Sequence, residues 1–222
     1  MDAPAPLPHA LPSTLLAAPT RAGAPLVTSA VLELANPPQK QVARVCYHLL
    51  AVEMIRSIEA STSYRVRRSN DTVAQLAQAD GAAHVPPPLT SEDEQEMVRA
   101  RVEAIGMHLG AGIAARLSRN KLRFNDTLDV IKFLCKDVWN ALWDKQIDNL
   151  RTNHKGVFVL QDKAFRPLCA DKDLGSYGAL QGAFAAGAVR GALDTLGVRA
   201  TTTADVTSPP LCVLHVRIAP AP

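Results

Sequence analysis

Apolar residues recur at helical spacing in four segments of the chain, and this pattern predicts four helices. Two candidate N-terminal caps support the boundaries: Ser91, with Glu94 three residues later as in a capping box, and either Asn125 or Asp126. Gly197 is the expected C-terminal cap of the last helix. The predicted helices span residues 41–61, 90–117, 125–147 and 176–197.

A period of two replaces the helical period beyond residue 149 and predicts strands. Residues 156–162 and 164–169 flank a short turn and are predicted to form a hairpin, whose second arm Pro167 places at a sheet edge. Residues 198–206 and 211–218 alternate apolar and polar side chains, which is typical of an antiparallel sheet with one dry face. The element order predicts an α+β fold, with helices packed on one face of a four-stranded antiparallel sheet.

The first predicted helix has an apolar surface wider than one core requires. Apolar side chains cover more than half of its girth, whereas a helix that rests on one core needs a stripe of about 100°. We therefore expect this helix to contact a partner as well as its own core. The candidate interface residues on it are Leu49, Leu50, Val52, Met54 and Ile55.

Two segments lack any clear periodicity. Residues 1–40 hold eight of the sixteen prolines, and we expect a disordered tail rich in proline and alanine, with a transit peptide as the alternative. Residues 62–90 end in three consecutive prolines and are expected to be a flexible insertion. The insertion carries a basic cluster that is either solvated or in contact with an acidic surface: Arg65, Arg67 and Arg68. The rest of residues 41–218 is predicted to be one domain.

Composition and charge narrow the function classes. The apolar share of 47% and the charged share of 20% fit a soluble globular protein. The net charge of +3 and the aromatic content of 5% disfavour nucleic-acid binding, and no apolar stretch is long enough to span a membrane. The cysteines form no CxxC pair and have no histidine at ligand spacing, so we expect buried, reduced thiols and neither a metal nor a cofactor. They are Cys46, Cys135, Cys169 and Cys212.

Two predicted helices are unusually rich in glycine. Neither glycine group follows a predicted strand or matches a phosphate-binding loop. A glycine inside a helix costs about 1 kcal/mol relative to alanine, and close approach of two helix backbones is the expected compensation. The glycines are Gly106, Gly110 and Gly112 in the second helix and Gly178, Gly182, Gly187 and Gly191 in the last.

The stretch KQIDNLRTNHKGVFVLQD, residues 145–162, concentrates polar side chains of the kind found in hydrolytic and metal sites. The chain contains no HExxH, no GxSxG and no paired histidines at ligand spacing. Asn153 and Gly156 are turn formers on either side of His154. We expect the polar side chains to cap the preceding helix and shape this turn rather than to catalyse hydrolysis. They include Asp148, Asn149, Arg151, Asn153, His154 and Asp162.

Much of the chain resembles a known protein family. Residues 123–168, RFNDTLDVIKFLCKDVWNALWDKQIDNLRTNHKGVFVLQDKAFRPL, closely resemble the small subunits of the transport protein particle (TRAPP), in particular the subunit-six type. The run KQIDNLRTNHKG followed by VLQD is the specific signature of that type. The resemblance covers residues 42–60 and 94–218, whereas the proline-rich tail and the insertion depart from the family pattern.

The resemblance implies a cytosolic, non-enzymatic scaffold subunit of a vesicle tether, peripheral at the endoplasmic reticulum and Golgi, in a complex that activates a Rab GTPase. It also implies contact with other TRAPP subunits and a heterodimer with the subunit-three type through the first two helices. Three residues of the second helix therefore join the candidate interface: Val98, Val102 and Ile105.

The acylated cysteine of the subunit-three type has no counterpart in this chain. In that type it lies in the loop after the second helix, and the corresponding loop here reads SRNKLRFND. Contact with membranes is therefore expected only through the complex. Two other function classes stay open: a small hydrophobic-ligand receptor, because vinyl-reductase-type domains are similar in fold, and an enzyme in which Asp148 and His154 share a pocket.

Overall fold

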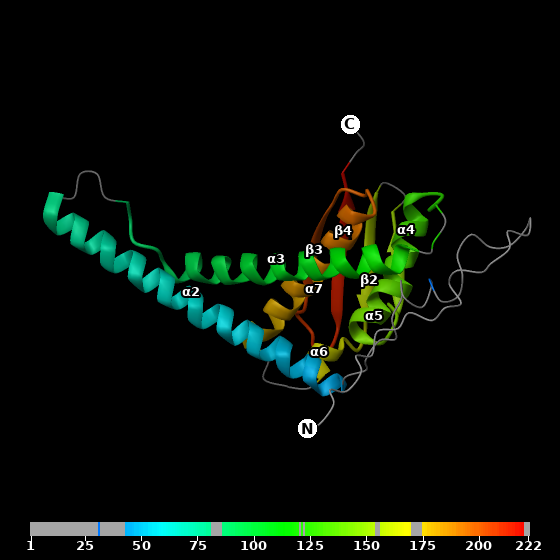
Figure 1. The fold of residues 1–222 in the computed structure, drawn as a ribbon, viewed down its shortest axis with the longest axis horizontal. Coiled ribbons are helices and arrows are strands. Elements are labelled where there is room, and N and C mark those ends of the chain that lie inside the picture. The colour runs from blue at the N-terminus through cyan, green and yellow to red at the C-terminus, as the bar shows by residue number, and fades with distance from the viewer. Residues whose placement is uncertain are drawn as a thin grey trace, which may run out of the picture. The chain divides into compact units, whose positions relative to one another are not determined.

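A four-stranded antiparallel sheet in the order β1-β2-β4-β3 lies at the centre of the fold (Figure 1). One face of the sheet is dry, because Leu160 lies opposite Leu214, and Phe158 lies opposite Val216. The sheet thus confirms the predicted α+β class. Its strands are β1 (Asn149–Thr152), β2 (Val157–Asp162), β3 (Ala200–Asp205) and β4 (Cys212–Ile218).

Helices cover the dry face. The computed structural model describes residues 31, 43–80, 86–119, 121, 123–153, 156–169 and 175–219, and Arg44–Pro222 form one compact unit to which the following refers. Helix α7 packs on β3, and α3 packs along α7 (Figure 1). The helices are α2 (Arg44–Asp80), α3 (Ser91–Ser118), α4 (Thr127–Phe133), the π-helical turn η3 (Leu134–Val138), α5 (Trp139–Trp143), α6 (Arg166–Cys169) and α7 (Gly175–Thr195).

The expected irregular insertion at 62–90 is wrong for residues 62–80, which continue α2 without a break. Thr62 and Val66 follow Ile58 at steps of four residues, and all three are buried. The Asn70 side chain then donates to and accepts from the backbone of Leu89 at 3.0 and 2.8 Å. The sequence did not predict this helix, because the few buried positions lie among polar residues and arginines. Within 1–40, only residue 31 is described, so the predicted tail lies almost wholly outside the described residues.

The predicted caps are correct in two cases and displaced by one residue in the third. Thr90 and Asp93 form the capping box of α3, in place of Ser91 and Glu94. Asp126 caps α4 by accepting from the Asp129 N–H at 2.7 Å. Gly197 follows α7 with a φ of 81°, the left-handed conformation that glycine adopts readily.

The predicted hairpin of 156–162 with 164–169 is wrong. Strand β2 pairs instead with β1, in the register Leu150 to Leu160, and with β4 on its other side. Residues Arg166–Cys169 form the short helix α6. The four residues of β1 are too few to show a period of two, and their polar side chains indicated a turn.

The glycines of α3 and α7 confirm the predicted close approach of two helix backbones. A Cβ atom on Gly106 or Gly110 would lie 2.3 Å from the carbonyl oxygen of Phe184 or 1.9 Å from that of Ala188. Reciprocally, a Cβ on Gly187 or Gly191 would meet the carbonyl oxygens of Glu103 and Met107. Gly112 and Gly182 are exceptions, since a Cβ on Gly112 would meet nothing within 4 Å and one on Gly182 would meet the Val206 side chain instead of the α3 backbone.

Candidate functional site

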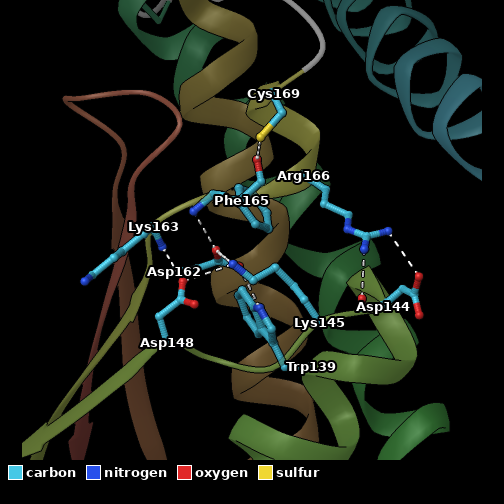
Figure 2. Close-up of polar contacts among 10 residues, drawn as sticks. Trp139, Asp144, Lys145, Asp148, Asp162, Lys163, Phe165, Arg166 and Cys169 are labelled. Carbon is cyan, nitrogen blue, oxygen red and sulfur yellow. Dashed lines mark hydrogen bonds and ion pairs between the residues drawn. The ribbon is translucent and has the colours of Figure 1, made fainter.

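Three groups of the protein converge on the buried carboxylate of Asp162 at the end of β2 (Figure 2), and of the polar side chains that the structure describes in residues 145–162 only Lys145 contacts it directly. One of its oxygens accepts from the indole N–H of Trp139 at 2.9 Å. The other accepts from the Ala164 N–H at 3.0 Å and forms an ion pair with Lys145. Both oxygens of Asp162 are therefore engaged with groups of the protein itself.

Lys145 extends this cluster to a second carboxylate. Its ammonium also lies 3.0 Å from Asp148, which in turn accepts from the Lys163 backbone N–H at 2.7 Å. That backbone hydrogen bond, with help from Lys145, lowers the pKa of Asp148 against the opposing effect of burial. Burial disfavours the charged form of Lys145, but hydrogen bonds and charge from Asp162 and Asp148 outweigh it and raise the pKa of this lysine.

The cluster has a structural role. It joins the segment after α5 to the start of β1 and to the turn after β2, while Arg166 holds Asp144 and its backbone carbonyl at 3.2 and 3.0 Å (Figure 2). Asn153 accepts from the Val157 N–H at 3.1 Å, and Gly156 has a φ of 81°, as expected for turn formers. His154 lies outside the described residues. Within the described part of the chain, no three His, Cys, Asp or Glu side chains could hold a metal ion.

The eight candidate interface residues separate into core and surface positions. Ile55, Val98 and Val102 lie in the chain's own core, with exposed fractions of 1%, 6% and 0%. Assigning these three to a partner interface is therefore wrong, because α2 and α3 bury them against their own neighbours. Val52 and Met54 are half-buried, whereas Leu49, Leu50 and Ile105 are exposed.

The start of α2 presents a group of exposed apolar side chains, which we name the α2 apolar surface. Val45, Leu49 and Leu50 are 58%, 59% and 66% exposed, and Tyr47 is also exposed. Val45 and Leu49 are one helical turn apart, whereas Leu50 and Tyr47 point to other sides of the helix. The surface consists of Val45, Tyr47, Leu49 and Leu50.

A groove that sequence reasoning missed opens where α2, α3, α7 and β3 meet. Its volume is about 1190 Å³, and carboxylates from three separate elements line it. The acidic run SEDEQE at the start of α3 has a local explanation, because negative side chains in the first turn complement the helix dipole. No local pattern shows that Glu59 of α2 and Asp205 of β3 lie beside this run, because the three segments are far apart in the sequence.

The cysteines are free thiols in two different environments. Cys135 and Cys212 are buried as predicted, and burial raises the pKa of each thiol to about 12. Cys46 and Cys169 are exposed, so the expectation of burial is wrong for this pair. In the described residues, we find no helix with the length and apolar character needed to cross a bilayer.

Comparison with known proteins identifies the family. Residues 47–219 match the family described as Transport protein particle (TRAPP) component. Trafficking protein particle complex subunit 6b of Danio rerio is 43% identical over 132 residues, which cover 58% of this chain and 84% of the relative. Subunit 6A of Homo sapiens is 42% identical over 140 residues, covering 61% and 86%.

A crystal structure of trafficking protein particle complex subunit 3 from Naegleria fowleri, covalently bound to palmitic acid, aligns with a TM-score of 0.47 at 11% identity. It covers 72% of this chain and 96% of that one. The family assignment rests on the sequence matches, which span both the helices and all four strands. The chain belongs to the TRAPP component family, and its relatives there are of the subunit-six type.

Proposed function

We propose that the chain is a non-catalytic scaffold subunit of a TRAPP vesicle-tethering complex that promotes guanine-nucleotide exchange on a Rab GTPase. The complex acts in transport from the endoplasmic reticulum to the Golgi and within the Golgi. The subunit is cytoplasmic and reaches these membranes peripherally, through its complex. Family membership supports a place among TRAPP subunits, and the resemblance to the subunit-six type supports the architectural role.

The observation that carries the proposal is the α2 apolar surface. Val45, Leu49 and Leu50 each expose more than half of a large aliphatic side chain within one and a half helical turns. Large apolar side chains exposed around one end of a helix are typical of protein interfaces, because burying them removes apolar area from water. The partner that we propose for this surface is a subunit-three-type TRAPP subunit, with Ile105 of α3 as a further contact.

The saturated cluster around Asp162 supports a non-catalytic role. General acids and bases need a proton-exchanging group that can reach a substrate. Asp162 is fully buried, and it is already bound to Lys145 and to the Trp139 indole. The groove also argues against a receptor for hydrophobic ligands, because its rim is acidic and apolar ligand pockets are lined mainly by hydrophobic and aromatic side chains.

Co-expression with a tagged subunit-three-type partner tests the proposed heterodimer. Replacing Leu49 and Leu50 with aspartate should abolish co-purification, because a central apolar contact commonly carries about 2 kcal/mol or more of binding. The variant should still fold, since both side chains are solvent-exposed in this chain. The melting curve of each purified variant checks that point.

Gln75→Asp is the control for position, since it adds a single negative charge at an exposed site near the other end of the same helix. This control should still bind the partner. If the Leu49→Asp, Leu50→Asp variant is folded and binds as well as the wild type, the heterodimer does not form through the α2 apolar surface.

A further inference from the structure

The groove between α2, α3, α7 and β3 shares no residue with the α2 apolar surface. With a volume of about 1190 Å³ it is larger than the roughly 300–1,000 Å³ of a small-molecule pocket, and it is open to solvent along one side. An open groove of this size suits a peptide segment better than a small ligand.

The charged lining of the groove is strongly acidic. Glu103 is paired with Arg190 at 3.2 Å, and Glu96 lies 4.0 Å from Arg99, the single cation among the lining residues. The other four carboxylates form no ion pair with any residue that the structure describes. The lining carboxylates are Glu59, Glu92, Glu94, Glu96, Glu103 and Asp205.

Local helix chemistry explains only part of this charge. Glu92 and Glu94 lie in the first turn of α3, where the helix dipole favours negative side chains. Glu59 comes from the middle of α2, and Asp205 ends β3. Neither position lies at the start of a helix, so the convergence of these carboxylates on one groove arises from the tertiary fold.

The floor of the groove carries a second, independent feature. Thr202 of β3 lines the floor with an exposed fraction of 8%, and its Oγ1 is buried without a hydrogen-bond partner among the described residues. Buried hydroxyls in proteins are nearly always hydrogen-bonded, and an unpaired one is costly. The surrounding floor is apolar and includes Val98, Leu180 and Ala183. A bound group with a polar atom would satisfy Thr202 where no described residue does.

We propose that this groove is a docking site for a basic peptide segment of another protein, with lysine or arginine side chains on the carboxylate rim and a small apolar side chain on the floor. Glu94 accepts a hydrogen bond from the Ser63 hydroxyl, and Asp205 accepts from the Thr207 N–H. Charge complementarity still selects this occupant, since the four carboxylates without an ion pair among the described residues repel nucleic acids and anionic membranes and attract cations. The site does not depend on which subunit occupies the α2 apolar surface.

Fluorescence anisotropy with the purified full chain tests the site. The probe is a short fluorescein-labelled peptide of alternating arginine and alanine, and its control has glutamine at each arginine position. The arginine peptide should bind and the glutamine peptide should not. Replacing Glu59 and Glu92 with lysine should weaken binding about tenfold or more, since each reversal turns an attraction into a repulsion. Added salt should weaken it further.

Three variants separate the groove from general charge effects. Asp71→Lys with Asp194→Lys makes the same change in net charge at two exposed positions outside the groove and should retain binding. Ala179→Trp fills the mouth of the groove from an exposed position on α7 and should abolish binding. Thr202→Val removes the unpaired hydroxyl at nearly constant shape and should weaken binding about threefold or more, the value of one modest hydrogen bond.

Equal binding of the two peptides, or no binding of the arginine peptide at millimolar concentration, would overturn the proposal. So would equal weakening by the groove variant and its charge-matched control. Analytical ultracentrifugation of the chain alone tests the other candidate occupant, a second copy of this chain. Self-association that Glu59→Lys with Glu92→Lys abolishes would assign the groove to a second copy of this chain and also overturn the proposal.

Discussion

Lys145 is the residue whose loss should damage the fold most directly. It neutralises Asp162, whose carboxylate is fully buried, and it bridges to Asp148 (Figure 2). Lys145→Met should lower the free energy of unfolding by about 3 kcal/mol, because it leaves a buried charge without its cation. Urea denaturation measures this change.

Two further variants make that prediction specific. Lys163→Met should change stability by less than about 0.5 kcal/mol, since the Lys163 side chain is exposed and points away from the cluster (Figure 2). Adding Asp162→Asn to Lys145→Met should restore part of the lost stability, because the uncompensated charge is removed. A loss below about 1 kcal/mol in Lys145→Met would mean that solvent, rather than this lysine, stabilises Asp162.

At the residue scale, the sequence predicted local backbone roles better than it predicted which side chains are buried and which are exposed. The turn-forming roles of Asn153, Gly156 and Gly197 follow from local backbone preferences and are confirmed. The exposed or buried state of Leu49 and Ile55 could not be assigned, because both lie on one broadly apolar helix and only tertiary packing distinguishes them. The same holds for Glu59 and Asp205, whose proximity to the start of α3 depends on the fold.

The contact between α3 and α7 is the tightest helix packing that the glycine positions reveal. A Cβ on Gly110 would lie 1.9 Å from a carbonyl oxygen of α7, and backbone atoms cannot move aside without separating the helices. Gly110→Ala should therefore destabilise the protein by about 2–3 kcal/mol, in spite of the better helix propensity of alanine. Thermal or urea unfolding gives the value.

Gly112→Ala is the matched control for that contact. It lies two residues later in α3, where a Cβ would meet nothing within 4 Å. The change in stability then depends on helix propensity alone, and alanine should stabilise the protein by up to about 1 kcal/mol. The two substitutions are therefore expected to have opposite signs, and stabilisation by both would show that α3 and α7 are not in backbone contact.

At the scale of elements, periodicity was reliable where the repeat was long. The segments 90–117 and 176–197 and the two C-terminal strands follow their patterns closely, whereas the predicted helix 125–147 contains the π-helical turn η3 and already ends at Trp143. The failures are β1, which is four residues long, and the second half of α2, where Thr62 and Val66 are buried and Val66 lies between Arg65 and Arg67. In both cases tertiary contacts supply most of the stability of the element, and a local pattern carries little of that information.

At the scale of the whole molecule, the family was predictable from the signature residues 145–162, and the fold class from the regular alternation of the last two strands. Residues 47–219 match the TRAPP component family. The α2 apolar surface is where we propose that this chain contacts its partner. Three large aliphatic side chains at its start are more than half exposed, and the chain supplies no described residue to cover them.

The proposed scaffold role predicts that the purified chain alone does not accelerate nucleotide release from any Rab GTPase on which the assembled complex acts. A protein that speeds release must bind the nucleotide-free GTPase more tightly than the loaded one, because only differential affinity shifts that equilibrium. In the proposed role, this subunit contributes contacts to other subunits and no such surface. Release of a fluorescent GDP analogue should stay within about twofold of the intrinsic rate, too small a factor to indicate a meaningful differential affinity.

The assembled complex is the positive control for that assay, and it extends the prediction. A complex prepared with the Leu49→Asp, Leu50→Asp variant should lack this subunit, because the proposed heterodimer contact is lost. When the purified variant chain is added to that complex, it should not be incorporated. The Gln75→Asp control chain, added in the same way, should be incorporated. Acceleration of release by the isolated chain at micromolar concentration would contradict the scaffold role and assign a GTPase-binding surface to this subunit.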